Sequence, residues 1–172
     1  MSNPTDEDRP DELELSIRSV AVQEAGEGRY VVVLQTSRGE LPGMLHPCEG
    51  GAAAVVFLSG ASGGIDGPAG ALYARLADGL GERGITSLRL DYRLPNQLDE
   101  CVLDAMGGLS FLRGIGARRL IVVGHSFGAA VAIKAGVLTP SVAAVAALSS
   151  QLNGTDGVGQ LAPRPLLLVH GT

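Results

Sequence analysis

Apolar positions along most of the chain form short runs that alternate with longer amphipathic segments. Five of these runs have the length and composition of buried strands: residues 53–59, 85–90, 120–123, 142–148 and 165–170. Three segments have the spacing or composition of helices: residues 68–83, 98–112 and the small apolar stretch that follows Gly128. This alternation predicts an α/β fold with a mostly parallel, doubly wound sheet and helices on both faces.

The beginning of the chain has a different pattern. Residues 1–14 are acidic and polar, which predicts a disordered tail. Three segments alternate apolar and polar residues and predict antiparallel lead-in strands: residues 16–23, 30–36 and 40–46. Pro42 cannot donate to a strand ladder, so its strand is expected at a sheet edge, and His46 at the end of that strand is expected at the surface. Residues 15–172 are expected to form a single domain.

Composition argues against several classes of function. The net charge of −5 and the absence of a Lys/Arg cluster argue against nucleic acid as a partner. No apolar run approaches the roughly 20 residues that cross a bilayer, and the acidic N-terminus is unlike a secretory signal. We therefore expect a cytoplasmic protein with no membrane partner. Cys48 and Cys101 suit neither a disulfide framework nor a metal site, and no metal or organic cofactor is implied.

The candidate chemistry centres on Gly124-His125-Ser126-Phe127-Gly128, between the strand at 120–123 and the next helix. So short a connection requires a sharp turn, and the glycines leave room for it. Ser126 would stand at its apex with the hydroxyl clear of its neighbours. An ordinary turn with a solvated serine is the alternative, but the order of strand, motif and helix favours a nucleophile.

A nucleophilic serine also needs donors for the oxyanion that forms when it attacks a carbonyl. The amide of Phe127, at the start of the helix, and that of Ala61, in the glycine-rich loop at 60–64, are candidates. Ligands bind at the carboxyl ends of parallel strands, so this loop, residues 91–93 and Ser126 are expected to meet. The loop could instead be a plain connector or a phosphate cradle, although no Gly-Lys-Ser/Thr follows it.

At this point a family resemblance emerges. Four stretches occur in the order found in the α/β-hydrolase superfamily: residues 58–64, 88–93, 124–128 and 166–172. From about Leu41 onward the chain resembles the small, cap-less members that are similar to dienelactone hydrolase. The resemblance implies a serine hydrolase of a small ester, thioester or lactone, acting through an acyl-Ser126 intermediate. It also implies that the backbone amides of Ala61 and Phe127 form the oxyanion hole.

One residue departs from the family pattern. Ser59 stands where many relatives carry a histidine just before the loop glycine. Because the oxyanion donors are backbone groups, we expect this change to be tolerated.

None of the three histidines is a convincing general base. His125 is adjacent to Ser126 and is expected to point away from its hydroxyl. His46 precedes the core sheet, and His170 is structural by resemblance. The family's acid and base would follow Thr172, so this chain is expected to be nearly inactive.

Other interpretations stay open. Asp91 and Asp156 are candidate acids, although loop-capping or surface roles are favoured for both. A non-catalytic binding or scaffold module with the hydrolase fold is the main alternative function. The sequence does not separate hydrolysis from acyl transfer, and it leaves open whether the chain forms a homo-oligomer.

Overall fold

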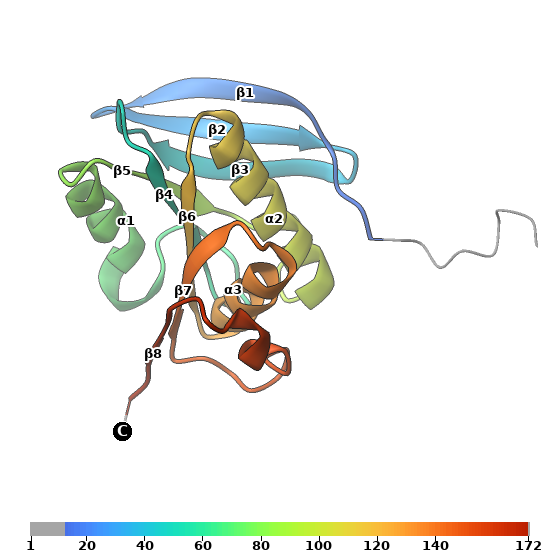
Figure 1. Ribbon diagram of the computed structural model, residues 1–172. Coiled ribbons are helices and arrows are strands. Elements are labelled where there is room, and N and C mark those ends of the chain that lie inside the picture. Colours follow the sequence, from blue (N-terminus) through green and yellow to red (C-terminus); the bar gives the residue numbers. More distant parts are fainter. Residues whose placement is uncertain (1–12, 172) are drawn as a thin grey trace, which may run out of the picture.

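The computed structural model describes residues 13–171, which form one eight-stranded sheet flanked by helices (Figure 1). The strands lie in the order β1-β2-β3-β5-β4-β6-β7-β8. Their bounds are β1 Ile17–Gly26, β2 Arg29–Thr36, β3 Gly39–His46, β4 Ala53–Leu58, β5 Ile85–Leu90, β6 Arg119–His125, β7 Val142–Leu148 and β8 Leu166–Val169. The tail predicted for residues 1–14 lies outside the described residues except for Leu13 and Glu14, which belong to no helix or strand.

The sheet changes character at β5. Strands β1, β2, β3 and β5 pair with their neighbours in antiparallel fashion, whereas β5, β4, β6, β7 and β8 pair in parallel. The central strand β4 is buried from Ala54 to Leu58, as its unbroken apolar run predicts. The antiparallel lead-in predicted from the alternating segments is therefore confirmed.

Pro42 predicts an edge position for β3, and this prediction is wrong, because β3 lies between β2 and β5. The carbonyl of Pro42 accepts a hydrogen bond from the Asp91 N–H at 3.0 Å. The backbone polar groups of Pro42 therefore point toward β5 and not toward β2. The ladder with β5 begins one residue later, at the pair of Gly43 and Leu90. Pro42 has no N–H to donate, but its nitrogen lies beyond the end of β5 at Leu90. The proline therefore removes no hydrogen bond from the ladder between β3 and β5.

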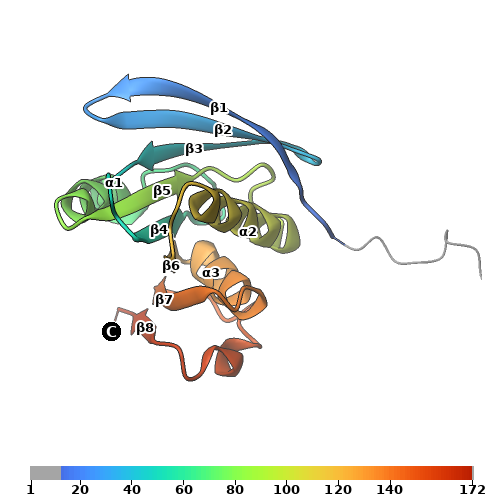
Figure 2. The ribbon, with the colours of Figure 1, turned by 45° about the horizontal axis from the view of Figure 1, so that its top comes forward.

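Helices cover both faces of the sheet (Figure 2). Helix α1 (Pro68–Gly81) lies on one face over a small apolar cluster that includes Val55 and Phe57 of β4. Helices α2 (Leu98–Gly114) and α3 (Phe127–Leu138) pack together over the larger core on the other face. Neighbouring side chains of β4 alternate between the two clusters, as strand geometry requires. The predicted doubly wound α/β fold is confirmed.

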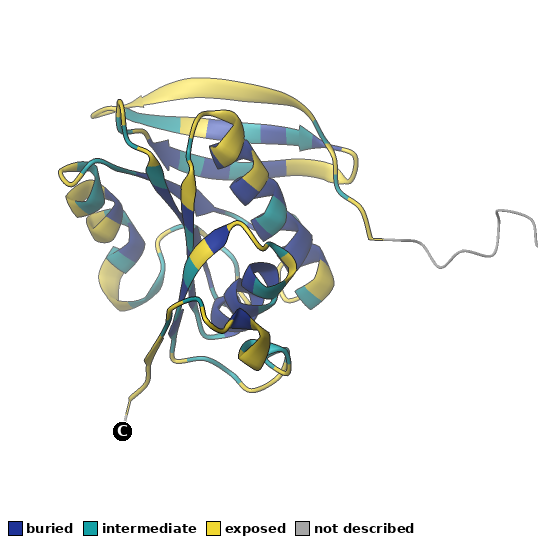
Figure 3. Ribbon diagram, viewed as in Figure 1, coloured by how far each residue is buried: buried dark blue, intermediate teal, exposed yellow. Residues whose placement is uncertain are grey.

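The last strands are covered less completely. The short 3₁₀ helix η2 (Val158–Leu161) packs on α3, and its Leu161 is buried. Strand β8 forms one edge of the sheet and is largely exposed (Figure 3), with Leu167, Leu168 and Val169 between 48% and 63% accessible. Among residues 13–171, no helix is both long enough and apolar enough to cross a membrane.

Candidate active site

Ser126 occupies the turn between β6 and α3. Strand β6 ends at His125 and α3 begins at Phe127, so one residue makes the whole connection. Its backbone has φ 56° and ψ −117°, a conformation that residues with a side chain rarely adopt. Holding such a residue costs about 1–3 kcal/mol and requires support from the surroundings. Part of that support is the Ser126 N–H, which donates to the Leu148 carbonyl of β7 at 2.9 Å.

The two motif glycines allow the backbone segments to approach closely. A Cβ atom on Gly124 would lie 1.9 Å from the carbonyl oxygen of Gly128. One on Gly128 would lie 2.2 Å from the Ser59 carbonyl oxygen and 2.4 Å from that of Leu58. Backbone atoms cannot move aside as a flexible side chain can, so both positions require glycine. The predicted steric reason for the motif is therefore confirmed at both glycines.

The loop after β4 folds back on itself beside this turn. The Ser59 hydroxyl donates to the Gly64 carbonyl, and the Gly63 N–H donates to the Gly60 carbonyl at 3.0 Å. The Gly64 N–H donates to Asp91 Oδ1 at 2.8 Å. Ser59, the departure from the family pattern, thus closes the loop with its hydroxyl. Asp91 has the loop-capping contact that was the favoured interpretation of this residue.

The loop and the Ser126 turn come into contact at Gly60. A Cβ atom built on Gly60 would lie 4.0 Å from Ser126 Cβ and 3.9 Å from His125 Nδ1. Ala61 follows in the same loop and is exposed, whereas Phe127 is buried in the first turn of α3. First-turn amides have no partner within their helix. Among the backbone hydrogen bonds of residues 13–171, neither the Ala61 N–H nor the Phe127 N–H is a donor.

Residues 91–93 also reach this region, as the strand order predicted. Tyr92 is 4% exposed, and its hydroxyl donates to the Ser59 carbonyl at 3.0 Å. Its ring meets that of Phe127 edge-on, with the centroids 6.1 Å apart. Sequence reasoning placed this segment at the site but assigned Tyr92 no contact. No local sequence pattern predicts these contacts, because the partners of Tyr92 lie 33 and 35 positions away in the chain.

Arg93 joins the same segment to α2. Its Nε donates to the fully buried Asp104, and its backbone N–H donates to the second oxygen of that carboxylate at 2.9 Å. Its guanidinium also pairs with Glu100 at 2.8 Å, and Arg38 pairs with the same carboxylate. The hydrogen bond from Arg38 is the largest of the effects that hold the pKa of Glu100 below its usual value.

The histidines are placed elsewhere. His46 is 6% exposed, so its predicted surface position is wrong. Its Nε2 accepts a hydrogen bond from Arg89 Nε at 3.1 Å, and its Nδ1 lies 3.3 Å from Asp78 Oδ1. Burial, and secondarily the Arg89 charge, lower the pKa of His46. His46 is buried because β3 lies inside the sheet, between β2 and β5. The sequence prediction had placed this residue before the core sheet.

His125 and His170 do not reach the Ser126 hydroxyl by any hydrogen bond within residues 13–171. His125 alternates along β6 with Gly124 and so shares the α1 face with Val123. His170 follows β8, and its Nδ1 lies 3.1 Å from the Gly171 carbonyl oxygen.

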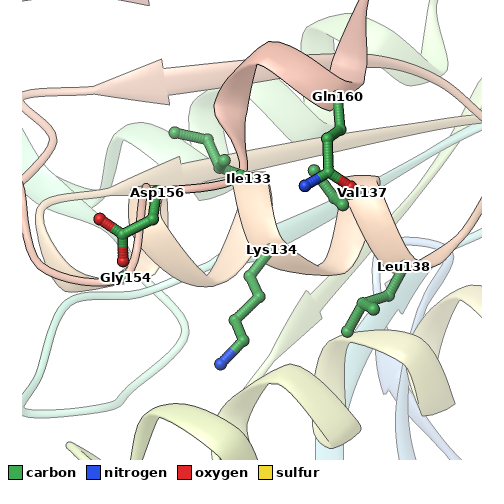
Figure 4. Close-up of a pocket in the computed structure, with 8 residues that line it drawn as sticks. Ile133, Lys134, Val137, Leu138, Gly154, Asp156 and Gln160 are labelled. Atoms are coloured by element: carbon green, nitrogen blue, oxygen red, sulfur yellow. The ribbon is translucent and has the colours of Figure 1, made fainter.

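Asp156 lies in a different place. It lines a pocket of about 250 Å³ between α3 and the segment that runs from Gly154 into η2, together with Ile133, Lys134 and Val137 (Figure 4). Ser126 is not among the residues that line this pocket.

Within the described part of the chain, no group of three or more His, Cys, Asp or Glu side chains could hold a metal ion. Cys48 and Cys101 are both free thiols, and burial raises the pKa of Cys101 to about 12.

No protein-family model and no curated protein matches the chain. Solved structures do match. A dienelactone hydrolase from Anabaena variabilis has a TM-score of 0.68 at 16% identity, over 86% of this chain and 85% of that one. An α/β hydrolase from a Penicillium species has a TM-score of 0.62 at 21% identity, over 71% of this chain and 46% of that one.

A Pyrococcus furiosus esterase has a TM-score of 0.61 at 21% identity, over 72% of this chain and 50% of that one. The chain thus spans about half the length of the Penicillium and Pyrococcus proteins. All three neighbours are hydrolases by description, and the likeness covers between 71% and 86% of this chain. Together with the strand order and the Ser126 turn, these similarities show that the chain has the α/β-hydrolase fold.

Proposed function

We propose that this protein is a serine hydrolase of a small carboxylic ester, thioester or lactone, with Ser126 as its nucleophile. One observation carries the proposal: Ser126 has a strained backbone at a strand-to-helix turn whose flanking glycines permit no side chain. A protein that needs only a turn here gains nothing from that strain. Strain of this kind is found where a reactive group must be held in one orientation.

The Ala61 and Phe127 amides are proposed to bind the oxyanion. A lone pair of the Ser126 Oγ would form a bond to the carbonyl carbon, the π electrons of the carbonyl bond would move onto its oxygen, and the hydroxyl proton would pass to a solvent water molecule. Two N–H groups from separate elements, the loop after β4 and the first turn of α3, are free to receive that oxygen. As the carbonyl bond re-forms, the bond to the alkoxide or thiolate would break, that group would take up a proton from solvent water, and an acyl-Ser126 ester would remain, which water or another acceptor then cleaves.

The weak point of the site is proton transfer. The hydroxyl proton of Ser126 must leave as the bond forms, and within residues 13–171 no hydrogen bond joins that hydroxyl to His46, His125 or His170. Loss of the base from a serine triad lowers the rate by about 10⁴–10⁶, and the remaining rate comes from the oxyanion hole and binding. We therefore propose that this 172-residue chain reacts, but slowly.

The substrate is proposed to be a small molecule that enters from solvent. Ala61 and Ser62 are exposed and Ser126 is half-buried, so the site is open on the side where the strands end. The residues between β7 and β8 form one short helix, η2, rather than a lid domain.

Covalent labelling tests the nucleophile. The purified chain is incubated with a fluorophosphonate probe, and the adduct is located by intact mass and peptide mapping. We expect one adduct, on Ser126, that is absent from the Ser126→Ala variant. An unlabelled but folded protein, or a label that survives in Ser126→Ala, would rule out Ser126 as the nucleophile.

The rate of the same reaction tests the inactivity proposal. Labelling is expected to be at least about 10³-fold slower than that of a hydrolase with a complete triad, measured side by side. Equal rates would contradict the view that Ser126 lacks a base.

A non-catalytic hydrolase-fold module is the second candidate. The placement of His46, buried against Arg89 and Asp78 instead of near Ser126, favours it. Complete absence of labelling in a protein whose circular dichroism and melting are normal would support this candidate over the enzyme.

A further inference from the structure

We propose that Tyr92 is a positioning residue that fixes the Ala61 and Phe127 amides relative to each other. The inference rests on the proposed function and extends it to a residue outside the motif. Tyr92 contacts both elements that supply these amides: its hydroxyl holds the Ser59 carbonyl, and its ring packs edge-on against Phe127. It touches neither Ser126 nor the space for substrate by any contact found within residues 13–171, so any effect must pass through these two neighbours.

The reason a positioning residue is needed lies in the topology. The loop that carries Ala61 follows β4, whereas Phe127 follows β6, and the chain between these two residues includes two helices and two strands. Two N–H groups bind one oxyanion only if their separation is fixed to within a fraction of an ångström. The Ser59 carbonyl lies at the root of the loop, two residues before Ala61, so a bond there restrains the direction in which the loop leaves β4.

Tyr92 is itself held firmly. On one side Asp91 accepts a hydrogen bond from the Gly64 N–H at 2.8 Å, which restrains the far end of the same loop. On the other side Arg93 is bound to the fully buried Asp104 of α2. Three consecutive residues therefore connect the loop root, the loop end and α2. Tyr92, almost fully buried among them, has little freedom to move.

The chain offers a matched control in Tyr73. This residue is also buried, and its hydroxyl donates to the Leu58 carbonyl at 2.9 Å, one residue before Ser59. Its ring, however, packs on Phe57 beneath α1, on the opposite face from Phe127. The variants Tyr92→Phe and Tyr73→Phe thus remove the same kind of hydrogen bond from adjacent carbonyls. Of the two tyrosine rings, only that of Tyr92 packs against Phe127.

The test measures single-turnover acylation of the full chain, with protein in excess over a p-nitrophenyl ester or the matching thionoester. Oxyanion donors stabilise the ester reaction more strongly, since sulfur is a weak acceptor of hydrogen bonds. Removal of a donor costs about 10²–10³-fold, so displacement of one is expected to cost roughly 10-fold. We expect Tyr92→Phe to lower the ratio of ester to thionoester rates about 10-fold, and Tyr73→Phe to leave it within twofold.

The possible outcomes distinguish failure of the proposed function from failure of the proposed role of Tyr92. If Ser126→Ala is acylated as fast as the native chain, the proposed function is wrong and the inference falls with it. If acylation requires Ser126 but Tyr92→Phe lowers both rates equally, or neither, the positioning role alone is wrong. Thermal melting of both variants identifies a general loosening of the fold, which would change the ester and thionoester rates together.

Discussion

At the scale of the residue, Ser126 combines a reactive position with an unfavourable backbone. Its φ of 56° brings Cβ close to the following peptide, a cost that glycine does not have. The neighbouring glycines and the hydrogen bond to Leu148 keep the turn in place despite this cost. The chemistry and the stability of the fold therefore make opposite demands on this one position.

This conflict predicts that Ser126→Gly is more stable than the native chain. Relief of about 1–3 kcal/mol of strain is partly offset by the greater flexibility of glycine in the unfolded state, which leaves a gain of about 1 kcal/mol. Ser126→Ala retains Cβ and serves as the matched control, for which no gain is expected. Urea unfolding measures the difference, and equal midpoints for the two variants would contradict the strain argument.

The motif made Ser126, Gly124 and Gly128 predictable, because their roles follow from a turn within five consecutive residues. Tyr92 and His46 were not predictable in this way. The partners of Tyr92 lie 33 and 35 residues away, and those of His46 lie 43 and 32 residues away. Such contacts depend on which strands become neighbours, and a single sequence carries no local sign of that.

At the scale of the element, the junction of β3, β5 and α1 is held by polar contacts within an apolar sheet. His46 of β3 accepts from Arg89 of β5 and lies against Asp78 of α1, and Arg89 reaches Asp66 in the loop before α1. Because Nε2 of His46 is the acceptor, the fold requires a neutral ring. Protonation would place a positive charge against Arg89.

The junction therefore predicts a pH dependence of stability. The pKa of His46 is lower in the folded protein than its value of about 6.5 in the unfolded chain. As pH falls through this unfolded value, the unfolded state takes up the proton first, so stability decreases until the folded pKa is passed. The slope contributed by one proton cannot exceed about 1.4 kcal/mol per pH unit.

The variant His46→Gln tests this dependence, because its amide retains a donor and an acceptor but does not titrate. We expect the unfolding free energy of the native chain to fall between pH 7 and pH 5, and that of His46→Gln to change less over the same range. Parallel pH profiles for the two proteins would show that His46 does not link folding to protonation.

Element types were predictable from apolar periodicity, and the predicted strands and helices all form. Which strands pair with one another was harder to predict. Pro42 suggested an edge strand because proline lacks a donor, yet the end of β5 at Leu90 makes that donor unnecessary. The error arose because the rule concerns one residue, whereas the outcome depends on where a second strand stops.

At the scale of the whole molecule, the sheet is covered unevenly. On one face, α2 and α3 pack over a large apolar core. On the other face α1 covers only a small apolar cluster, and the last strands are less covered there. On that face the apolar side chains Ile121, Val123 and Leu148 are only partly buried. Strand β8 adds exposed side chains and, within residues 13–171, pairs only with β7. An exposed apolar edge strand is a template for pairing with another chain.

This edge predicts concentration-dependent self-association. Leu167→Lys places a charge on the 59% exposed position of β8 and is expected to shift the protein towards the monomer in sedimentation experiments. Leu152→Lys makes the same change in charge at a loop position that is 89% exposed, and it is expected to have no such effect. Equal behaviour of the two variants would exclude β8 as the contact.

The uncovered edge also has a consequence for the ionic conditions under which the protein is handled. Each copy carries a net charge of −5, so two copies repel one another as their β8 strands approach. Added salt shortens the range of that repulsion from about 30 Å at 0.01 M to about 8 Å at 0.15 M, while apolar contact is not weakened. Low ionic strength should therefore keep the chain dispersed, and physiological salt should favour assembly through β8.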